Sequence, residues 1–188
     1  VSGIRWQHRL NERPLFGEVN HDKSSIRKTD GLEYVGYEFR GYGGQIRVSR
    51  KKLDAFKRRA SEIFRKSRGV SMKSRYSEFR TYAQGWIGYF ALDQVKTTFA
   101  NLDKWLRRRV RACYWVQWRK SKTRLKKLMS LGVSYRVARG FAMSGKGPWR
   151  LSMTSGVQRA LSIEYLTGEG LLNLEERWQS FASLRRTA

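Results

Sequence analysis

The sequence predicts an α+β chain that is mostly helical, with a short β-hairpin, a three-helix bundle and further short C-terminal helices. Three observations predict this class. Residues 32–48 are rich in aromatic and β-branched residues around a glycine-rich loop, which is typical of a hairpin. From residue 49 to about residue 118, apolar residues recur at spacings of three and four, as on one face of a helix. The short links between these helices favour an antiparallel bundle.

The predicted hairpin has two arms, LEYVGYEF at residues 32–39 and QIRV at residues 45–48. Between them, RGYGG at residues 40–44 supplies glycines, which adopt the positive φ angles of a turn at little cost. We therefore expect one strand on each side of this loop.

Ser49 is the expected N-cap of the first helix, because its hydroxyl can accept a hydrogen bond from the first turn. The apolar face of this helix holds Leu53, Phe56, Ala60, Ile63 and Phe64. The opposite face is basic and carries Lys51, Lys52, Lys57, Arg58, Arg59, Arg65 and Lys66. Gly69 is a typical helix stop.

The second helix is expected at about residues 74–91. Its apolar face consists of Tyr76, Phe79, Ala83, Trp86, Ile87 and Phe90. Gly85 and Gly88 lie inside it, where each glycine costs up to about 1 kcal/mol relative to alanine. This cost indicates that another backbone or a ligand passes close to them.

Asp93 is the expected cap of the third helix, which should reach about Trp118. Its apolar face consists of Val95, Phe99, Leu102, Leu106, Val110 and Cys113. Shorter helices are expected at residues 121–131, 134–143 and 154–166, with a loop at residues 144–149. Asn173 opens a last helix and Glu176 follows three residues later, as in a capping box.

The charge of the chain is strongly one-sided. Its 188 residues include 40 Lys and Arg against 15 Asp and Glu, for a formal net charge of +25. Residues 104–163 contain no Asp or Glu, yet they hold sixteen Lys and Arg. Such a surface repels itself unless a polyanion lies against it. Nucleic acid is the expected polyanion, because its phosphates release counterions when Lys and Arg neutralise them.

The sequence argues against several other functions. No apolar run approaches the roughly 20 residues that span a bilayer, so no membrane partner is expected. The lack of a signal-peptide pattern and the single cysteine, Cys113, favour a cytoplasmic, bacterial-type location. No catalytic constellation stands out, and one cysteine with His8 and His21 cannot form a usual zinc site. We expect a binding function, with no metal or cofactor in this chain.

Basic and aromatic residues interleave in WLRRRVRACYWVQWRKSKTRLKK at residues 105–127. With the basic face of the first helix, they form the candidate RNA-binding set: Arg107, Arg108, Arg109, Arg111, Trp115, Trp118, Arg119, Lys120, Lys122, Arg124, Lys126 and Lys127. Arginine makes bidentate contacts with phosphate, and the two tryptophans could stack on unpaired bases. For each tryptophan taken alone, packing in the core is favoured over stacking.

Several segments carry a family resemblance in a consistent order. VNHDKSS at residues 19–25 and LEYVGYEF at residues 32–39 resemble the end of the palm in group II intron reverse transcriptases. GWIGYF at residues 85–90 and WVQWRKSKTRLKKLMSLGV at residues 115–133 resemble the thumb, or maturase, domain of that family. GKGPWRLS at residues 145–152 and GEGLLNLEERW at residues 168–178 are similar to the C-terminal pattern of a bacterial subgroup.

The resemblance implies roles for particular residues. Lys23 matches a palm lysine near the incoming nucleotide, and Tyr34, Val35, Gly36 and Tyr37 match the primer grip. A plain hairpin is the alternative for the latter. Gly85, Trp86 and Tyr89 match thumb positions, for which we favour helix packing. The resemblance also implies a division into the palm end at residues 1–48, a thumb and maturase-specific domain at residues 49–133, and a C-terminal extension at residues 134–188.

The implied partners are intron RNA and an RNA/DNA template–primer, and binding of a DNA target is left open. The complete parent enzyme would use Mg²⁺, held by an Asp-Asp motif, and no Asp-Asp occurs in this sequence. We therefore expect this chain alone to be inactive as a polymerase. Two other hypotheses remain: a general basic nucleic-acid-binding structural protein, and a decayed fragment without activity. The sequence indicates no oligomeric state.

Overall fold

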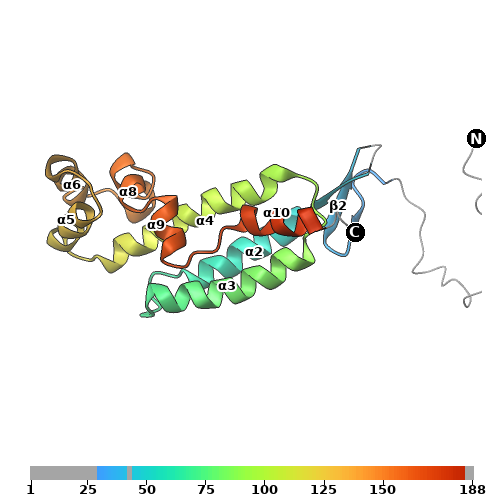
Figure 1. Ribbon diagram of the computed structural model, residues 1–188, viewed down its shortest axis with the longest axis horizontal. Helices are drawn as coiled ribbons and strands as arrows, with labels where there is room; N and C mark the ends of the chain where they lie inside the picture. The colour runs from blue at the N-terminus through green and yellow to red at the C-terminus, as the bar shows by residue number, and fades with distance from the viewer. Residues whose placement is uncertain (1–28, 42–43, 185–188) are drawn as a thin grey trace, which may run out of the picture.

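The computed structural model describes residues 29–41 and 44–184. A small sheet lies at one end of an elongated molecule, three long helices run side by side from it, and short helices form the other end (Figure 1). Within the described residues there are nine helices and a three-stranded antiparallel sheet. The predicted α+β, mostly helical class is confirmed.

The sheet contains strands β1 (Glu33–Tyr34), β2 (Tyr37–Arg40) and β3 (Gln45–Val48), in that order and all antiparallel. The expectation of one continuous strand over residues 32–39 is wrong. Val35 and Gly36 have φ angles of 51° and 85°, and Tyr34 pairs with Tyr37 across them. Positive φ at both central residues is the requirement of a two-residue I′ turn, so the segment folds back on itself.

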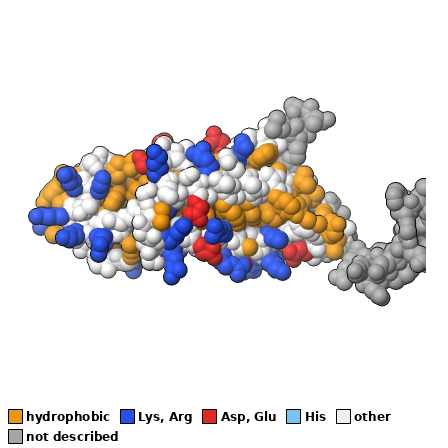
Figure 2. Space-filling view, turned by 90° about the horizontal axis from the view of Figure 1, so that it is seen from below, with side chains coloured by type: hydrophobic (Ala, Val, Ile, Leu, Met, Phe, Trp, Pro, Cys, Tyr) orange, Lys and Arg blue, Asp and Glu red, His pale blue; other side chains and the backbone are white. Residues whose placement is uncertain are grey.

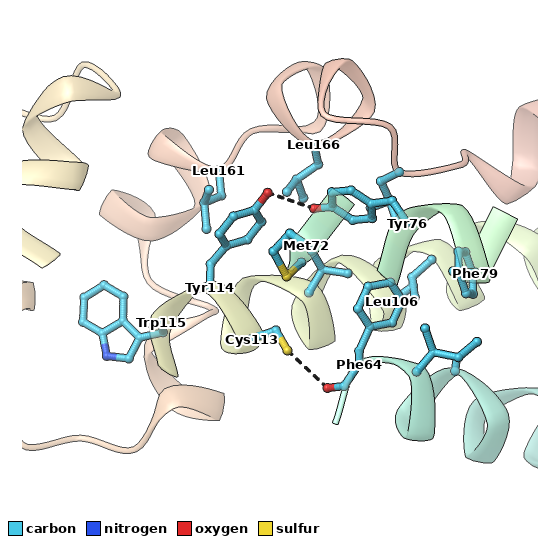
Figure 3. Packing of buried hydrophobic residues seen from close by; sticks show 14 of the residues in the cluster. Phe64, Met72, Tyr76, Phe79, Leu106, Cys113, Tyr114, Trp115, Leu161 and Leu166 are labelled. Atoms are coloured by element: carbon cyan, nitrogen blue, oxygen red, sulfur yellow. Dashed lines mark hydrogen bonds between the residues drawn. The ribbon is translucent and has the colours of Figure 1, made fainter. Parts of the chain in front are cut away.

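Three long helices follow: α2 (Arg50–Ile63), α3 (Met72–Tyr89) and α4 (Lys96–Gln117). Their predicted apolar faces meet in one core, in which Phe56, Ile63, Phe79, Phe99 and Leu106 are fully buried. The predicted three-helix bundle is therefore confirmed (Figures 1 and 3).

The predicted start of α4 at Asp93 is wrong, because the helix begins at Lys96. The Asp93 carboxylate instead accepts hydrogen bonds from the backbone N–H groups of Val48, at 2.8 Å, and Val95, at 2.6 Å. These bonds join the end of β3 to the segment before α4, so the aspartate fixes the sheet on the bundle. Burial raises the pKa of Asp93, and the two backbone hydrogen bonds oppose this rise.

The last helix, α10 (Leu174–Leu184), returns to the bundle and packs against α3 and α4. The predicted cap at Asn173 is confirmed, since its side chain accepts a hydrogen bond from the N–H of Glu176 at 3.2 Å. Buried Asp103 on α4 accepts two further bonds, from the N–H groups of Leu174 and Glu175. These bonds fix the first turn of α10 to α4.

Five short helices form the end opposite the sheet: α5 (Ser121–Ser130), α6 (Tyr135–Ala142), α7 (Pro148–Leu151), α8 (Ser155–Ala160) and α9 (Ile163–Gly168). Two expectations here are wrong. The predicted loop at residues 144–149 is helical from Pro148, because proline is favourable in the first helical turn. The single helix predicted over residues 154–166 is two helices, and Ser162 caps the second by accepting from the N–H of Tyr165.

The expected close approach of another backbone to the glycines of α3 is also wrong. Gly85 and Gly88 are both exposed on the bundle surface. A Cβ at Gly85 would meet no atom within 4 Å, and one at Gly88 would meet only the ring of Phe181, at 3.9 Å. Trp86, between them, faces the core and lies 4.5 Å from the Phe56 ring, centroid to centroid.

Candidate nucleic-acid interface

The basic face predicted on α2 is exposed but partly neutralised. Lys51, Lys52, Arg58, Arg65 and Lys66 are exposed, and Lys57 is half-buried. Arg59 forms ion pairs with Glu62, at 3.1 Å, and Glu78, at 3.3 Å. Figure 2 shows acidic and basic side chains close together along the middle of the molecule. This surface is therefore of mixed sign.

The arginine cluster of α4 is not brought together on one surface. Arg108 stacks on the Trp149 ring at 4.0 Å, and Arg109 donates to the Ser61 carbonyl at 3.2 Å. Arg111 is buried and donates to the Leu161 carbonyl at 2.9 Å, while Arg107 stays half-buried. Successive helical residues are about 100° apart around the axis, so four arginines within five residues face different neighbours. Arg108, Arg109 and Arg111 therefore hold the structure around α4.

Burial of Arg111, together with the charge of Arg107, lowers the pKa of the Arg111 guanidinium. The side chain is 8% exposed, which leaves little of it for a phosphate. The two predicted RNA-binding tryptophans are also buried, since Trp115 is 1% and Trp118 is 7% exposed. This finding supports the packing alternative for both. The Arg124 guanidinium lies 5.0 Å from the Trp115 ring centroid, and covers it from outside.

The strongest cationic surface begins after α4. Arg119, Lys120, Lys122, Lys126 and Lys127 are exposed, and no ion pair engages them within the described part of the chain. Further along, Arg136, Arg139, Lys146, Arg150 and Arg159 are also exposed. We call these ten residues the basic end. They lie between the end of α4 and the end of α8, and Figure 2 shows Lys and Arg side chains gathered at this tip of the molecule.

Half of the basic end was missing from the predicted site. The signal for it lies in the sequence, because the acid-free run extends to residue 163 and covers all ten residues. The candidate set stopped at Lys127, where basic and aromatic residues cease to alternate. The fold then gathers the later cations beside the earlier ones, since α6 and α8 both pack against α5.

At the opposite end, the predicted primer-grip residues lie on the β1–β2 turn. Tyr34 is 67% and Val35 is 56% exposed, while the hydroxyl of buried Tyr37 donates to the Tyr89 carbonyl at 2.6 Å. The Tyr89 hydroxyl in turn donates to the Val35 carbonyl at 3.1 Å. Two segments far apart in sequence are thus joined. Lys23 and the two histidines lie outside the described residues.

The sequence did not predict the burial of Arg75, which is 1% exposed and lies in the first turns of α3 beside the end of α2. Its guanidinium donates to the carbonyls of Val70, Ile63 and Arg65, at 3.0, 3.2 and 2.6 Å. These carbonyls belong to the end of α2 and the loop after it. The sequence around Arg75 gives no sign that this arginine is buried. Its hydrogen-bond partners lie outside α3, and a helical pattern does not record them.

Two further types of site were sought among the described residues. No helix there has the length and hydropathy to cross a bilayer. No group of three or more His, Cys, Asp or Glu residues in the same ranges is placed to hold a metal ion.

The comparisons with known proteins identify the central segment. The family described as group II intron, maturase-specific domain matches residues 53–132. The match includes all of α3, α4 and α5 and most of α2, together with the GWIGYF segment at residues 85–90. A search of curated proteins gives no match to the chain. The chain therefore carries, over residues 53–132, a group II intron maturase-specific domain, which implies a role in the splicing of intron RNA.

Proposed function

We propose that this chain binds folded group II intron RNA through the basic end and thereby assists splicing. The observation that carries the proposal is the concentration of ten exposed cations, none of them in an ion pair within the described residues, on a maturase-specific domain and the helices that follow it. Each cation that reaches a phosphate releases condensed counterions. Because phosphates of a folded RNA are brought close together, a compact cationic tip binds the folded form better than the extended one. Binding then shifts the RNA toward its folded state.

A second part of the proposal concerns the parent enzyme. The turn formed by Tyr34, Val35, Gly36 and Tyr37 would contact the primer strand of an RNA/DNA template–primer, and Lys23 would lie near the nucleotide. The hydrogen bonds between this turn and Tyr89 support it, because they give the turn a fixed position on the thumb. On this proposal residues 1–48 end a palm, residues 49–133 form the thumb and residues 134–188 extend it. Polymerisation and its Mg²⁺ would belong to the complete enzyme.

The experiment titrates the purified chain against a transcript of a group II intron. A piece of ribosomal RNA with the same length as the transcript serves as competitor. Filter binding measures the dissociation constant from 50 to 200 mM salt. If six to ten phosphates are neutralised, affinity should fall by about 10³–10⁵-fold over this range. The intron transcript should also be preferred over the competitor. Equal affinity for both RNAs would instead favour a general nucleic-acid-binding protein.

A pair of charge variants locates the surface. Lys122→Glu with Lys126→Glu reverses two exposed charges one turn apart on α5, and should weaken intron binding and lower the salt slope by about 2. Lys96→Glu with Lys104→Glu changes the net charge equally, at exposed positions on α4 outside the basic end. The control pair should alter the slope much less. An equal loss of intron affinity in both pairs would contradict the proposal that the basic end is the RNA-binding surface.

A further inference from the structure

A groove with a volume of about 740 Å³ opens where the three-helix bundle meets the small C-terminal helices. Its lining comes from the loop after α2, the first turn of α3, the ends of α4 and α5, and α9. Ligand pockets in proteins usually have volumes of roughly 300–1,000 Å³. The groove is therefore large enough for a nucleotide, and it lies next to the basic end, with which it shares Arg119 and Lys127.

One side of the groove is an aromatic wall formed by Tyr114, Trp118 and Tyr165. The Tyr114 ring centroid lies 6.0 Å from that of Trp118 and 6.4 Å from that of Tyr165. Tyr165 is half-buried, whereas the other two are 7% exposed, so Tyr165 offers the most accessible ring. The hydroxyl of Tyr76, a buried residue of α3, donates to that of Tyr114 at 3.2 Å (Figure 3). Burial raises the pKa of Tyr114 to about 12.

The groove also has a cationic rim formed by Lys66, Arg119 and Lys127, all exposed. The first turn of α3 borders the groove and contains no acid, so its partial positive charge adds to the rim. Among the described lining residues Glu169 is the one acid, and its charge contributes to raising the pKa of both Tyr114 and Tyr165. A phosphate is thus repelled from the tyrosine wall and attracted to the rim.

We propose that this groove holds one unpaired nucleotide of the bound RNA, with its base against Tyr165, the accessible ring of the aromatic wall, and its phosphate at the cationic rim. The inference rests on the proposed RNA-binding function, because it names the part of the RNA that the groove takes. A paired base cannot enter, since its faces are covered in the duplex, whereas unpaired bases are free to stack on aromatic side chains. Tyr165 and Glu169 lie beyond the matched family segment, so the C-terminal helices complete this site.

The test compares a single-stranded RNA of twelve nucleotides with the same RNA annealed to its complement. Tyr165→Leu keeps an apolar side chain but removes the ring, and should weaken single-strand binding by about tenfold, from the usual worth of one stacked base. Duplex binding should be unchanged, because the cations of the basic end remain. Tyr165→Phe should bind as the unaltered chain does. Tyr135→Leu is the matched control at an exposed tyrosine outside the groove, and should have no effect.

A second measurement uses the unaltered chain and therefore does not depend on the folding of a variant. The same single strand, substituted with 4-thiouridine, should crosslink to the peptides containing residues 114–119 or 165–169, and annealing should abolish these crosslinks. Crosslinks confined to α5 and α6, or an equal loss of single-strand and duplex binding in Tyr165→Leu, would overturn the groove proposal while leaving RNA binding intact. If the unaltered chain binds neither RNA, the proposed function itself fails.

Discussion

At the scale of single residues, two buried arginines stabilise the fold by hydrogen bonds to backbone carbonyls, although in the sequence they look like part of a charged surface. Arg75 and Arg111 each donate to backbone carbonyls of another segment, at the end of α2 and at Leu161. Arginine suits this role because its planar guanidinium presents several donors in fixed directions. A carbonyl at the end of a helix lacks a partner within that helix and carries partial negative charge. The buried cations are therefore satisfied without a carboxylate.

Replacement of Arg75 tests this account. Arg75→Met keeps most of the side-chain volume but removes the shorter of the hydrogen bonds that the carbonyls of Val70, Ile63 and Arg65 accept. These carbonyls keep only the longer bonds, of 3.3–3.4 Å, from Arg68 and Gln117. We expect the free energy of unfolding to fall by about 2–4 kcal/mol, the usual range when buried polar groups lose a charged partner. Urea unfolding followed by circular dichroism measures the change. Arg80→Met is the control, because exposed Arg80 makes one hydrogen bond, to Gly170, and should cost less than about 1 kcal/mol.

The raised pKa of the single cysteine gives a prediction about how fast its thiol reacts. Cys113 is 1% exposed and its thiol donates to the Phe64 carbonyl at 3.2 Å (Figure 3). Burial raises the pKa of this thiol. Since the thiolate is the reactive form, a raised pKa means a smaller reactive fraction at any pH below it. The folded chain at pH 8 should therefore react with a disulfide reagent far more slowly than the chain unfolded in guanidinium. Rapid labelling of the folded chain would contradict the burial of Cys113.

At the scale of elements, glycine has opposite meanings in two helices. Gly156 on α8 lies directly against the Phe141 ring of α6, which is where an added Cβ would clash. Gly85 on α3 faces solvent with no atom within 4 Å of a built Cβ. The close packing that the sequence suggested for α3 is thus found between α6 and α8. The intrinsic cost of a helical glycine is visible in sequence, but the neighbour that justifies it is not.

This contrast gives a matched pair of substitutions. Gly156→Ala should lower the free energy of unfolding by about 1–3 kcal/mol, because α6 and α8 must separate to admit a methyl group. Gly85→Ala should raise it by up to about 1 kcal/mol, because alanine is the better helix former and meets no clash. Thermal unfolding of both variants measures the difference. A stabilising Gly156→Ala would show that the contact with Phe141 relaxes easily.

At the scale of the whole molecule, the C-terminal helices pack back onto the three-helix bundle. The matched family segment ends at residue 132, yet Leu166, Leu171, Leu174 and Trp178 belong to the same buried cluster as the bundle. The Trp178 ring stacks on Phe99 of α4 with centroids 5.2 Å apart. The helices after α5 thus complete the core, and they also supply part of the basic end and part of the groove lining.

A shortened chain tests this interdependence. A fragment of residues 49–133 should unfold at a lower temperature than the full chain and bind an apolar dye, because the surfaces that Trp178 and its neighbours cover would be exposed. Calorimetry and dye fluorescence of the two proteins provide the comparison. An unchanged unfolding temperature would mean that residues 134–188 only dock on a bundle that is stable without them.

The sequence by itself determined the helical class, the three long helices and their buried faces, because spacings of three and four mark one side of a helix irrespective of its neighbours. It also determined the cationic character, since the acid-free run is a property of composition. The inward placement of Arg75, Arg111 and Trp115, and the joining of Tyr89 to the β1–β2 turn, were decided only by the tertiary structure. Each depends on a contact between segments distant in sequence, and no local pattern records which partner a side chain will meet.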